Sequence, residues 1–199
     1  MTALTRLLAT LCRSSQSQPM EHDVAQIAEA VRVPLYARLT EWLSADRSRA
    51  MLLKFACLFA DGDGARRALN RLRFSRLEIN LAHALAQNRN ALSRLPERIA
   101  DLDAHRFFRD AGGTGADIVL FSLAWQLSKP AEERARSLPK AFWLWETYFL
   151  RHAAVIAPAP LVDGQEITER FELSGAQIGA ALRHLIEAQV SGQVTTRAQ

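Results

Sequence analysis

Residues 75–88 read SRLEINLAHALAQN, and this stretch decides the fold class of the chain. Its apolar side chains recur three and four residues apart, which is the period of a helix with one buried face. Ser75 and Glu78 have the spacing of a capping box, in which each side chain binds the other residue's backbone amide at a helix start. We therefore predict a helix over residues 75–88.

The helical period continues through the rest of the chain. No stretch alternates polar and apolar residues between turn signals, as a half-buried strand does. We predict an all-α fold, a multi-helix bundle followed by a small helical tail. Besides residues 75–88, the predicted helices span residues 2–12, 24–32, 35–44, 47–60, 65–72, 96–110, 116–127, 139–155, 164–171 and 175–190.

Two prolines, Pro158 and Pro160, interrupt this pattern towards the end of the chain. Proline lacks an amide hydrogen and disfavours helix at the preceding residue. We predict a linker here, which divides a helical domain over residues 1–156 from a small tail domain over residues 157–199.

The composition is typical of a globular protein, with a net charge of +4 and a pI near 9.6. Arginine carries nearly all of the positive charge, and its planar guanidinium suits bidentate phosphate contacts. A GC-rich genome produces the same bias, so both readings stay open. No apolar run approaches the roughly 20 residues of a membrane helix, and no signal-peptide cleavage context follows the first apolar segment. We expect no membrane partner and a cytoplasmic location.

Few residues suggest a metal or a cofactor. Cys12 and Cys57 stand far apart without a CxxC motif or a histidine partner, and the histidines show no ligand spacing among themselves. Asp61 and Asp63 lack the later ligands of a calcium loop, so we interpret residues 61–64 as a helix-terminating turn. We expect no cofactor.

Several arginines cluster in sequence and are candidates for contacts with a phosphate backbone. Solvated helix faces with acidic partners are the alternative interpretation. The cluster consists of Arg66, Arg67, Arg71, Arg73 and Arg76, followed by Arg89, Arg94, Arg98, Arg106 and Arg109.

Longer strings resemble a known family. Residues 68–78, ALNRLRFSRLE, are similar to the "L-x-R-L-R-F-S-x-x-E" segment of the HD-containing tRNA nucleotidyltransferase and poly(A) polymerase family. Residues 106–112, RFFRDAG, resemble its "R-F-F-R-D-x-G" turn, and Asp117 and Leu123 are spaced as in its following helix. Residues 160–167 and 174–197 resemble the start and the close of its last domain.

This resemblance implies an HD-like bundle followed by the family's tail, and an RNA-binding role with tRNA or a tRNA-like acceptor stem and elbow as ligand. The arginines would contact phosphates, and the helix that opens at Gly175 would present free amides to one more phosphate. The implied RNA-binding residues are Arg66, Arg67, Arg71, Arg73, Arg76, Arg106, Arg109, Gly175, Gly179 and Arg183.

The chain departs from the family at its HD metal site. Asp23 is kept near the start, but Ile27 stands where the histidine belongs, and residues 58–64 read LFADGDG in place of "L-L-H-D-I-G-K". Only Asp61 remains of the His-Asp pair, so we expect the metal site to be lost. Similarity begins about 16 residues after Met1, so we expect no catalytic head and no nucleotidyl transfer by this chain alone. It is then a stand-alone relic, a partner of a separate nucleotidyltransferase head, or a fragment.

Two further functions remain open. One is a divergent HD phosphohydrolase that uses Asp61, Asp63, His22 and His83. The other is a protein-interaction scaffold, for which the tryptophans Trp125, Trp143 and Trp145 would be anchors unless they are core residues.

Overall fold

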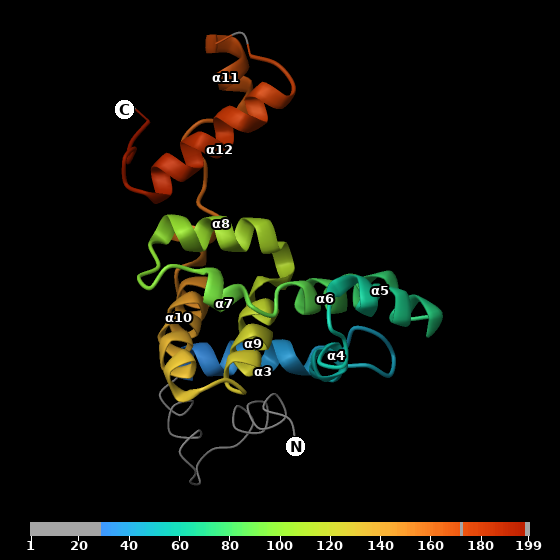
Figure 1. Ribbon diagram of the computed structural model, residues 1–199. Coiled ribbons are helices and arrows are strands. Elements are labelled where there is room, and N and C mark those ends of the chain that lie inside the picture. The colour runs from blue at the N-terminus through green and yellow to red at the C-terminus, as the bar shows by residue number, and fades with distance from the viewer. Residues whose placement is uncertain (1–28, 172, 198–199) are drawn as a thin grey trace.

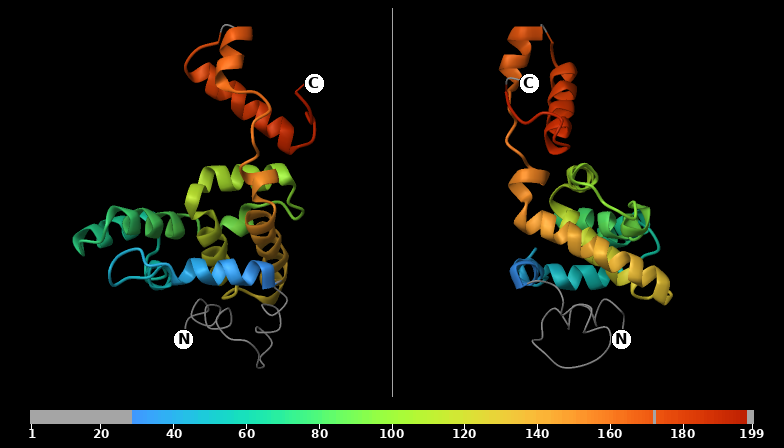
Figure 2. Two further views of the ribbon diagram at one scale, coloured as in Figure 1. Left: turned by 180° about the vertical axis from the view of Figure 1, so that it is seen from behind. Right: turned by 90° about the vertical axis from the view of Figure 1, so that its left-hand side faces the viewer.

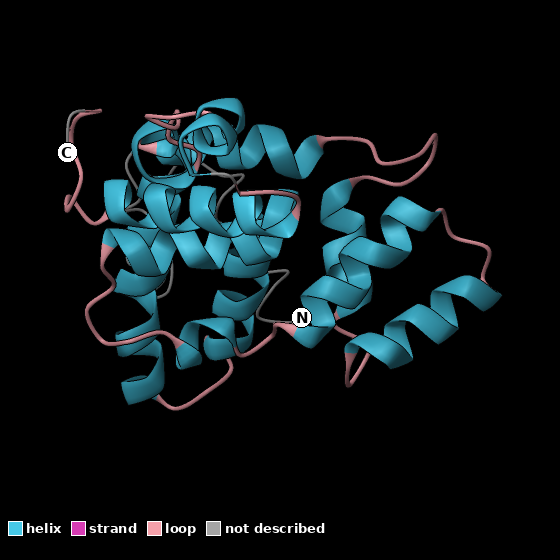
Figure 3. Ribbon diagram, turned by 90° about the horizontal axis from the view of Figure 1, so that it is seen from above, coloured by secondary structure: helices cyan, strands magenta, loops and turns pink. Residues whose placement is uncertain are grey.

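The computed structural model describes residues 29–171 and 173–197. Within these ranges every regular element is a helix, apart from one isolated bridge between Trp42 and Ser48, and this confirms the all-α prediction (Figure 3). The elements are α3 (Glu29–Thr40), α4 (Arg49–Ala56), α5 (Gly62–Arg71), α6 (Arg76–Gln87), α7 (Ala91–Arg94), α8 (Asp101–Ala111), η1 (Gly112–Thr114), α9 (Gly115–Gln126), α10 (Ala131–Leu150), η2 (His152–Ile156), α11 (Gly164–Phe171) and α12 (Ala176–Val190). The helix predicted over residues 2–12 lies outside the described residues.

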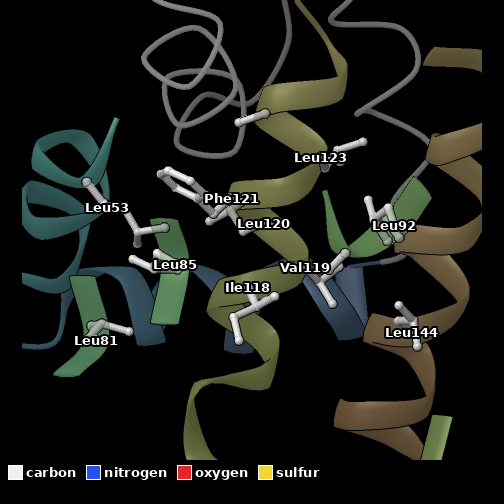
Figure 4. Packing of buried hydrophobic residues seen from close by; sticks show 14 of the residues in the cluster. Leu53, Leu81, Leu85, Leu92, Ile118, Val119, Leu120, Phe121, Leu123 and Leu144 are labelled. Carbon is white, nitrogen blue, oxygen red and sulfur yellow. The ribbon is translucent and has the colours of Figure 1, made fainter. Parts of the chain in front are cut away.

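Helix α9 forms the centre of the bundle. Its sequence, GADIVLFSLAWQ, has apolar residues on every side, and every residue except Trp125 is buried. A helix that is hydrophobic all round needs neighbours on every face. Figure 4 shows Phe121 and Leu120 on the side of Leu53, Leu81 and Leu85, while Val119 lies towards Leu92 and Leu144. The elements α4, α6, α7 and α10 therefore enclose α9.

The capping box at the start of α6 is present as predicted. The Ser75 hydroxyl accepts a hydrogen bond from the Glu78 amide at 3.3 Å, and Glu78 Oε2 accepts one from the Ser75 amide at 2.7 Å. Arg47 Nε also donates to Glu78 Oε1 at 2.8 Å, and Glu78 is fully buried. These bonds lower the pKa of the Glu78 carboxyl, although its burial alone would raise it. The buried carboxylate therefore stays charged and fixes the start of α6.

Two prolines lie inside helices where the sequence predicts helix boundaries. The sequence predicts separate helices over residues 24–32 and 35–44, but α3 runs through Pro34. Likewise, Pro139 is predicted to open a helix and instead lies within α10. A proline removes one backbone hydrogen bond, and burial on the helix's inner face offsets that loss. Val31, Leu35 and Leu39 supply such a face in α3.

Other helix boundaries also differ from the predicted ones. The helix predicted over residues 47–60 ends at Ala56, and that over residues 96–110 begins only at Asp101. The short helix α7 is not predicted from the sequence, and the helix predicted over residues 65–72 begins earlier, at Gly62.

A buried ion-pair network joins α3, α4 and α9. Arg38 donates from Nε and Nη2 to the two carboxylate oxygens of Asp117 at 3.1 and 2.8 Å. Arg49 Nη1 donates to Asp117 Oδ2 at 2.9 Å, and its Nη2 donates to Glu41 at 2.7 Å. Asp117 is 1% exposed, so its carboxylate is shielded from water and is bound instead by these two arginines.

The tail helices α11 and α12 lie beyond α8, outside the bundle, and residues 157–163 lead to them (Figures 1 and 2). Helix α11 spans the residues predicted for it, and α12 begins one residue later than predicted, after Gly175. The division into two domains after residue 156 stays a prediction.

Candidate nucleic-acid interface

Helices α5 and α6 pack against each other as a hairpin that projects from the side of the bundle away from α10 (Figures 1 and 2). Gly62 allows their close approach, because a Cβ atom there would lie 2.7 Å from Nδ1 of His83. The inner face of α5 consists of Gly62, Ala65 and Leu69. At 100° per residue, Arg67 and Arg71 lie on the opposite, solvent face.

The turn between the two helices contains Arg73 in a left-handed conformation, with φ of +57°. The Arg73 amide donates to the carbonyl of Asn70 at 3.1 Å, and the Phe74 amide donates to that of Leu69 at 3.0 Å. This is the Schellman arrangement, whose left-handed position is usually glycine. The turn thus holds a bulky cation where glycine would be less strained.

Phe74 anchors the same turn to the bundle. Its ring lies 5.7 Å from that of Phe55, and the Arg47 guanidinium stands 4.3 Å above it. Because Arg47 also binds the buried Glu78, the turn and the start of α6 are held by one set of contacts. The exposed side chains on either side of Phe74 are therefore presented from a fixed backbone.

Five arginines, here called the hairpin arginines, are exposed on this element. None of them forms an ion pair with any residue in the described ranges. The alternative of a solvated face with acidic partners requires such pairs, and they are missing from this part of the structure. The hairpin arginines are Arg66, Arg67, Arg71, Arg73 and Arg76.

Arg106 and Arg109 of α8 are in a different situation, because both bind one carboxylate of the tail. Arg106 Nε donates to Glu187 Oε2 at 3.1 Å, and Arg109 Nη1 donates to Glu187 Oε1 at 2.5 Å. Hydrogen bonds from Arg106 and then Arg109 lower the pKa of Glu187 to about 2. A phosphate would have to displace Glu187 to reach these arginines. Glu187 lies in a string that resembles the family, but nothing in the sequence signals its pairing with Arg106 and Arg109.

The remaining predicted residues lie at the start of α12 or within it. Gly175 has φ of +52° at the helix start, and no side chain caps the first turn there. A Cβ atom at Gly179 would lie 3.7 Å from Nη1 of Arg183, so the Arg183 guanidinium extends over Gly179. Because α12 lies beyond α8, the predicted residues form two groups, the hairpin arginines and those of the α8–α12 contact (Figure 1).

The residues that the resemblance compares with an HD metal site do not form a metal centre in the described part of the chain. The Asp61 carboxylate accepts a hydrogen bond from the Gly64 amide at 2.6 Å and caps α5. Residues 61–64 therefore start a helix, and the prediction that they terminate one is wrong. Asp63 Oδ1 lies 3.9 Å from Nδ1 of His83. Within residues 29–171 and 173–197, no three His, Cys, Asp or Glu side chains come together. His22 lies outside the described residues.

The three tryptophans proposed as anchors are either buried or in contact with cations of this chain. Trp145 is fully buried, and its Nε1 donates to the Ala116 carbonyl at 3.4 Å, so it is a core residue and not an anchor. Trp125 has the cations of Arg89 and Lys129 within 5.2 Å of its ring centroid, and Trp143 has that of Arg151 at 6.0 Å.

Comparisons with known proteins found no match for this chain among family models, curated proteins or solved structures. None of the helices in the described ranges combines the length and the apolar character that crossing a membrane requires.

Proposed function

We propose that this chain is an RNA-binding module whose main contact surface is the α5–α6 hairpin. One observation carries the proposal: the hairpin arginines are exposed and unpaired within the described residues. Arginines that neutralise RNA phosphates release condensed counterions, and this release supplies much of the affinity. An arginine that already binds a carboxylate, such as Arg109, gains less from a phosphate.

The ligand we propose is tRNA or a tRNA-like RNA. It follows from the resemblance of residues 68–78 and 106–112 to the tRNA nucleotidyltransferase and poly(A) polymerase family. A separate nucleotidyltransferase head is the protein partner that the same resemblance suggests. We propose binding for this surface and no chemical step. The phosphohydrolase alternative gains no support here, because Asp61 caps α5.

The proposal is tested by reversing charge on the solvent face of α5. Arg67→Glu combined with Arg71→Glu leaves the buried face of the helix untouched. The matched control is Arg134→Glu with Arg136→Glu on α10, at the other side of the bundle, which changes the net charge equally (Figure 1). Fluorescence anisotropy with labelled tRNA at low and moderate salt measures affinity and its salt dependence.

We expect the hairpin variant to bind tRNA at least ~10-fold more weakly than wild type. The slope of log affinity against log salt should fall by about 1 for each phosphate that the variant no longer neutralises. The control should stay within about twofold of wild type. Equal weakening in both variants would mean that total charge alone decides binding. Failure of the wild-type chain to bind tRNA in low salt would overturn the proposal.

A further inference from the structure

We infer that the turn between α5 and α6 contacts unpaired nucleotides, so that the ligand is an RNA stem with single-stranded nucleotides beside it. The inference rests on the proposed function and concerns two leucines, Leu72 and Leu77. They are 57% and 59% exposed, and they flank the turn that carries Arg73. Because α6 leads from this turn to α7, the turn lies at the end of the hairpin away from α7.

The two leucines are neighbours of arginines in the sequence, and neither belongs to the hydrophobic core. Leu72 follows Arg71 and precedes Arg73, and Leu77 follows Arg76. Phe74, the remaining large apolar residue of the turn, faces inward against Phe55. Residues 71–77 therefore expose the arginines Arg71, Arg73 and Arg76 together with Leu72 and Leu77 on one rigid turn.

This turn keeps two features that reduce stability. A non-glycine residue at a positive φ is strained, and two leucines more than half exposed leave apolar surface in water. Such features persist where function uses them. The Schellman hydrogen bonds and the contacts of Phe74 and Glu78 hold the turn in place, so little conformational entropy is lost when a ligand binds.

A leucine side chain does not bind phosphate. The group that the leucines contact therefore differs from the phosphates that the arginines bind. Apolar side chains contact the faces of nucleobases, and they wedge between base steps in some nucleic-acid complexes. In A-form RNA the major groove is deep and narrow, and paired bases stack on each other. Leu72 and Leu77 reach base faces only where nucleotides are unpaired, while the neighbouring arginines hold the adjoining stem.

The test uses two labelled RNAs that share one stem, the first with a single-stranded 3′ extension and the second blunt-ended. The double variant Leu72→Ser and Leu77→Ser is compared with wild type. The control is Leu58→Ser with Leu150→Ser, which removes two leucines that are also exposed but lie elsewhere. Circular dichroism and thermal unfolding check that each variant is folded.

We expect wild type and the control to bind the extended RNA at least ~5-fold more tightly than the blunt RNA, a difference of about 1 kcal/mol. The turn variant should lose this preference, and it should keep its affinity for the blunt RNA and its salt slope. A turn variant that keeps the preference, or loses affinity equally for both RNAs, overturns the inference.

A wild-type chain that binds neither RNA overturns both the proposed function and the role of the leucines. A chain that binds both RNAs equally, and still depends on Arg67 and Arg71, keeps the proposed function and overturns only the role of the leucines. Binding to anionic phosphatidylserine vesicles that is lost in the turn variant, without a preference between the RNAs, would assign the leucines to a membrane surface instead.

Discussion

Arg73 is a residue at which stability and the proposed RNA binding are opposed. Its φ of +57° suits glycine, so Arg73→Gly removes a steric penalty of about 1–2 kcal/mol and adds unfolded-state entropy that offsets part of it. We expect Arg73→Gly to raise the free energy of unfolding in urea by roughly 0.5–1 kcal/mol. It should also weaken RNA binding.

Arg73→Ala is the matched variant, because it loses the guanidinium and keeps the strained φ. It should weaken RNA binding as much as Arg73→Gly, without a gain in stability. If Arg73→Gly binds RNA as wild type does, the Arg73 side chain is no phosphate contact. If it is less stable than Arg73→Ala, the strain argument is wrong.

Asp117 is the residue on which the buried ion-pair network depends. Asp117→Asn leaves Arg38 and Arg49 without the carboxylate that both bind, and such a loss costs about 3–5 kcal/mol in a buried network. Asp110→Asn removes an exposed partner of Arg109 and should cost less than about 1 kcal/mol. Chemical denaturation of both variants checks this difference, and equal losses would contradict it.

At the scale of elements, Glu187 links α12 to α8 through Arg106 and Arg109. Its pKa of about 2 lies below the usual 4.5. Because the folded-state pKa is lowered, the contribution of this carboxylate to the stability of the fold is fully present above pH 4.5. It declines as the pH falls towards 2. We expect an NMR titration of the Glu187 side-chain carboxyl to give a midpoint near pH 2.

The double variant Arg106→Ala and Arg109→Ala removes the cause of this shift. The Glu187 midpoint should then move up towards 4.5. A midpoint near 4.5 already in the wild-type chain would show that α12 does not bind α8 through this residue in solution.

Prediction from sequence succeeded for elements whose signals are local. Ser75 and Glu78 are three residues apart, so their capping box and the start of α6 could be predicted. Pro34 misled the prediction, because burial of Leu35 and Leu39 against distant helices outweighs one lost hydrogen bond. The limits of α3 are set by tertiary packing, which the pattern of a single segment does not contain.

In the candidate site too, local features could be predicted from the sequence and long-range contacts could not. The hairpin arginines are neighbours in sequence, so their clustering could be predicted from α5 and the turn alone. Glu187 stands 81 residues from Arg106 and 78 from Arg109, and nothing local indicates that it binds both. The left-handed φ of Arg73 could not be predicted either, because glycine is the residue that normally signals such a turn.

For the whole molecule, the distribution of the core predicts how the two parts depend on each other. The described core cluster extends from Val31 to Val155, whereas α12 has no buried residue and α11 buries only Ile167. Most of the hydrophobic stabilisation therefore resides before the linker. We expect the chain shortened after Ile156 to unfold cooperatively, with a Tm within about 4 °C of the full chain, which corresponds to about 1 kcal/mol.

Leu120→Ala in the full chain is the contrasting variant, because it removes a fully buried side chain of α9. It should cost about 2–5 kcal/mol and lower the Tm more than removal of the whole tail does. Differential scanning calorimetry of the three proteins compares them directly. If the shortened chain loses more stability than Leu120→Ala, the tail is an integral part of the bundle, and the boundary predicted after residue 156 is not a domain boundary.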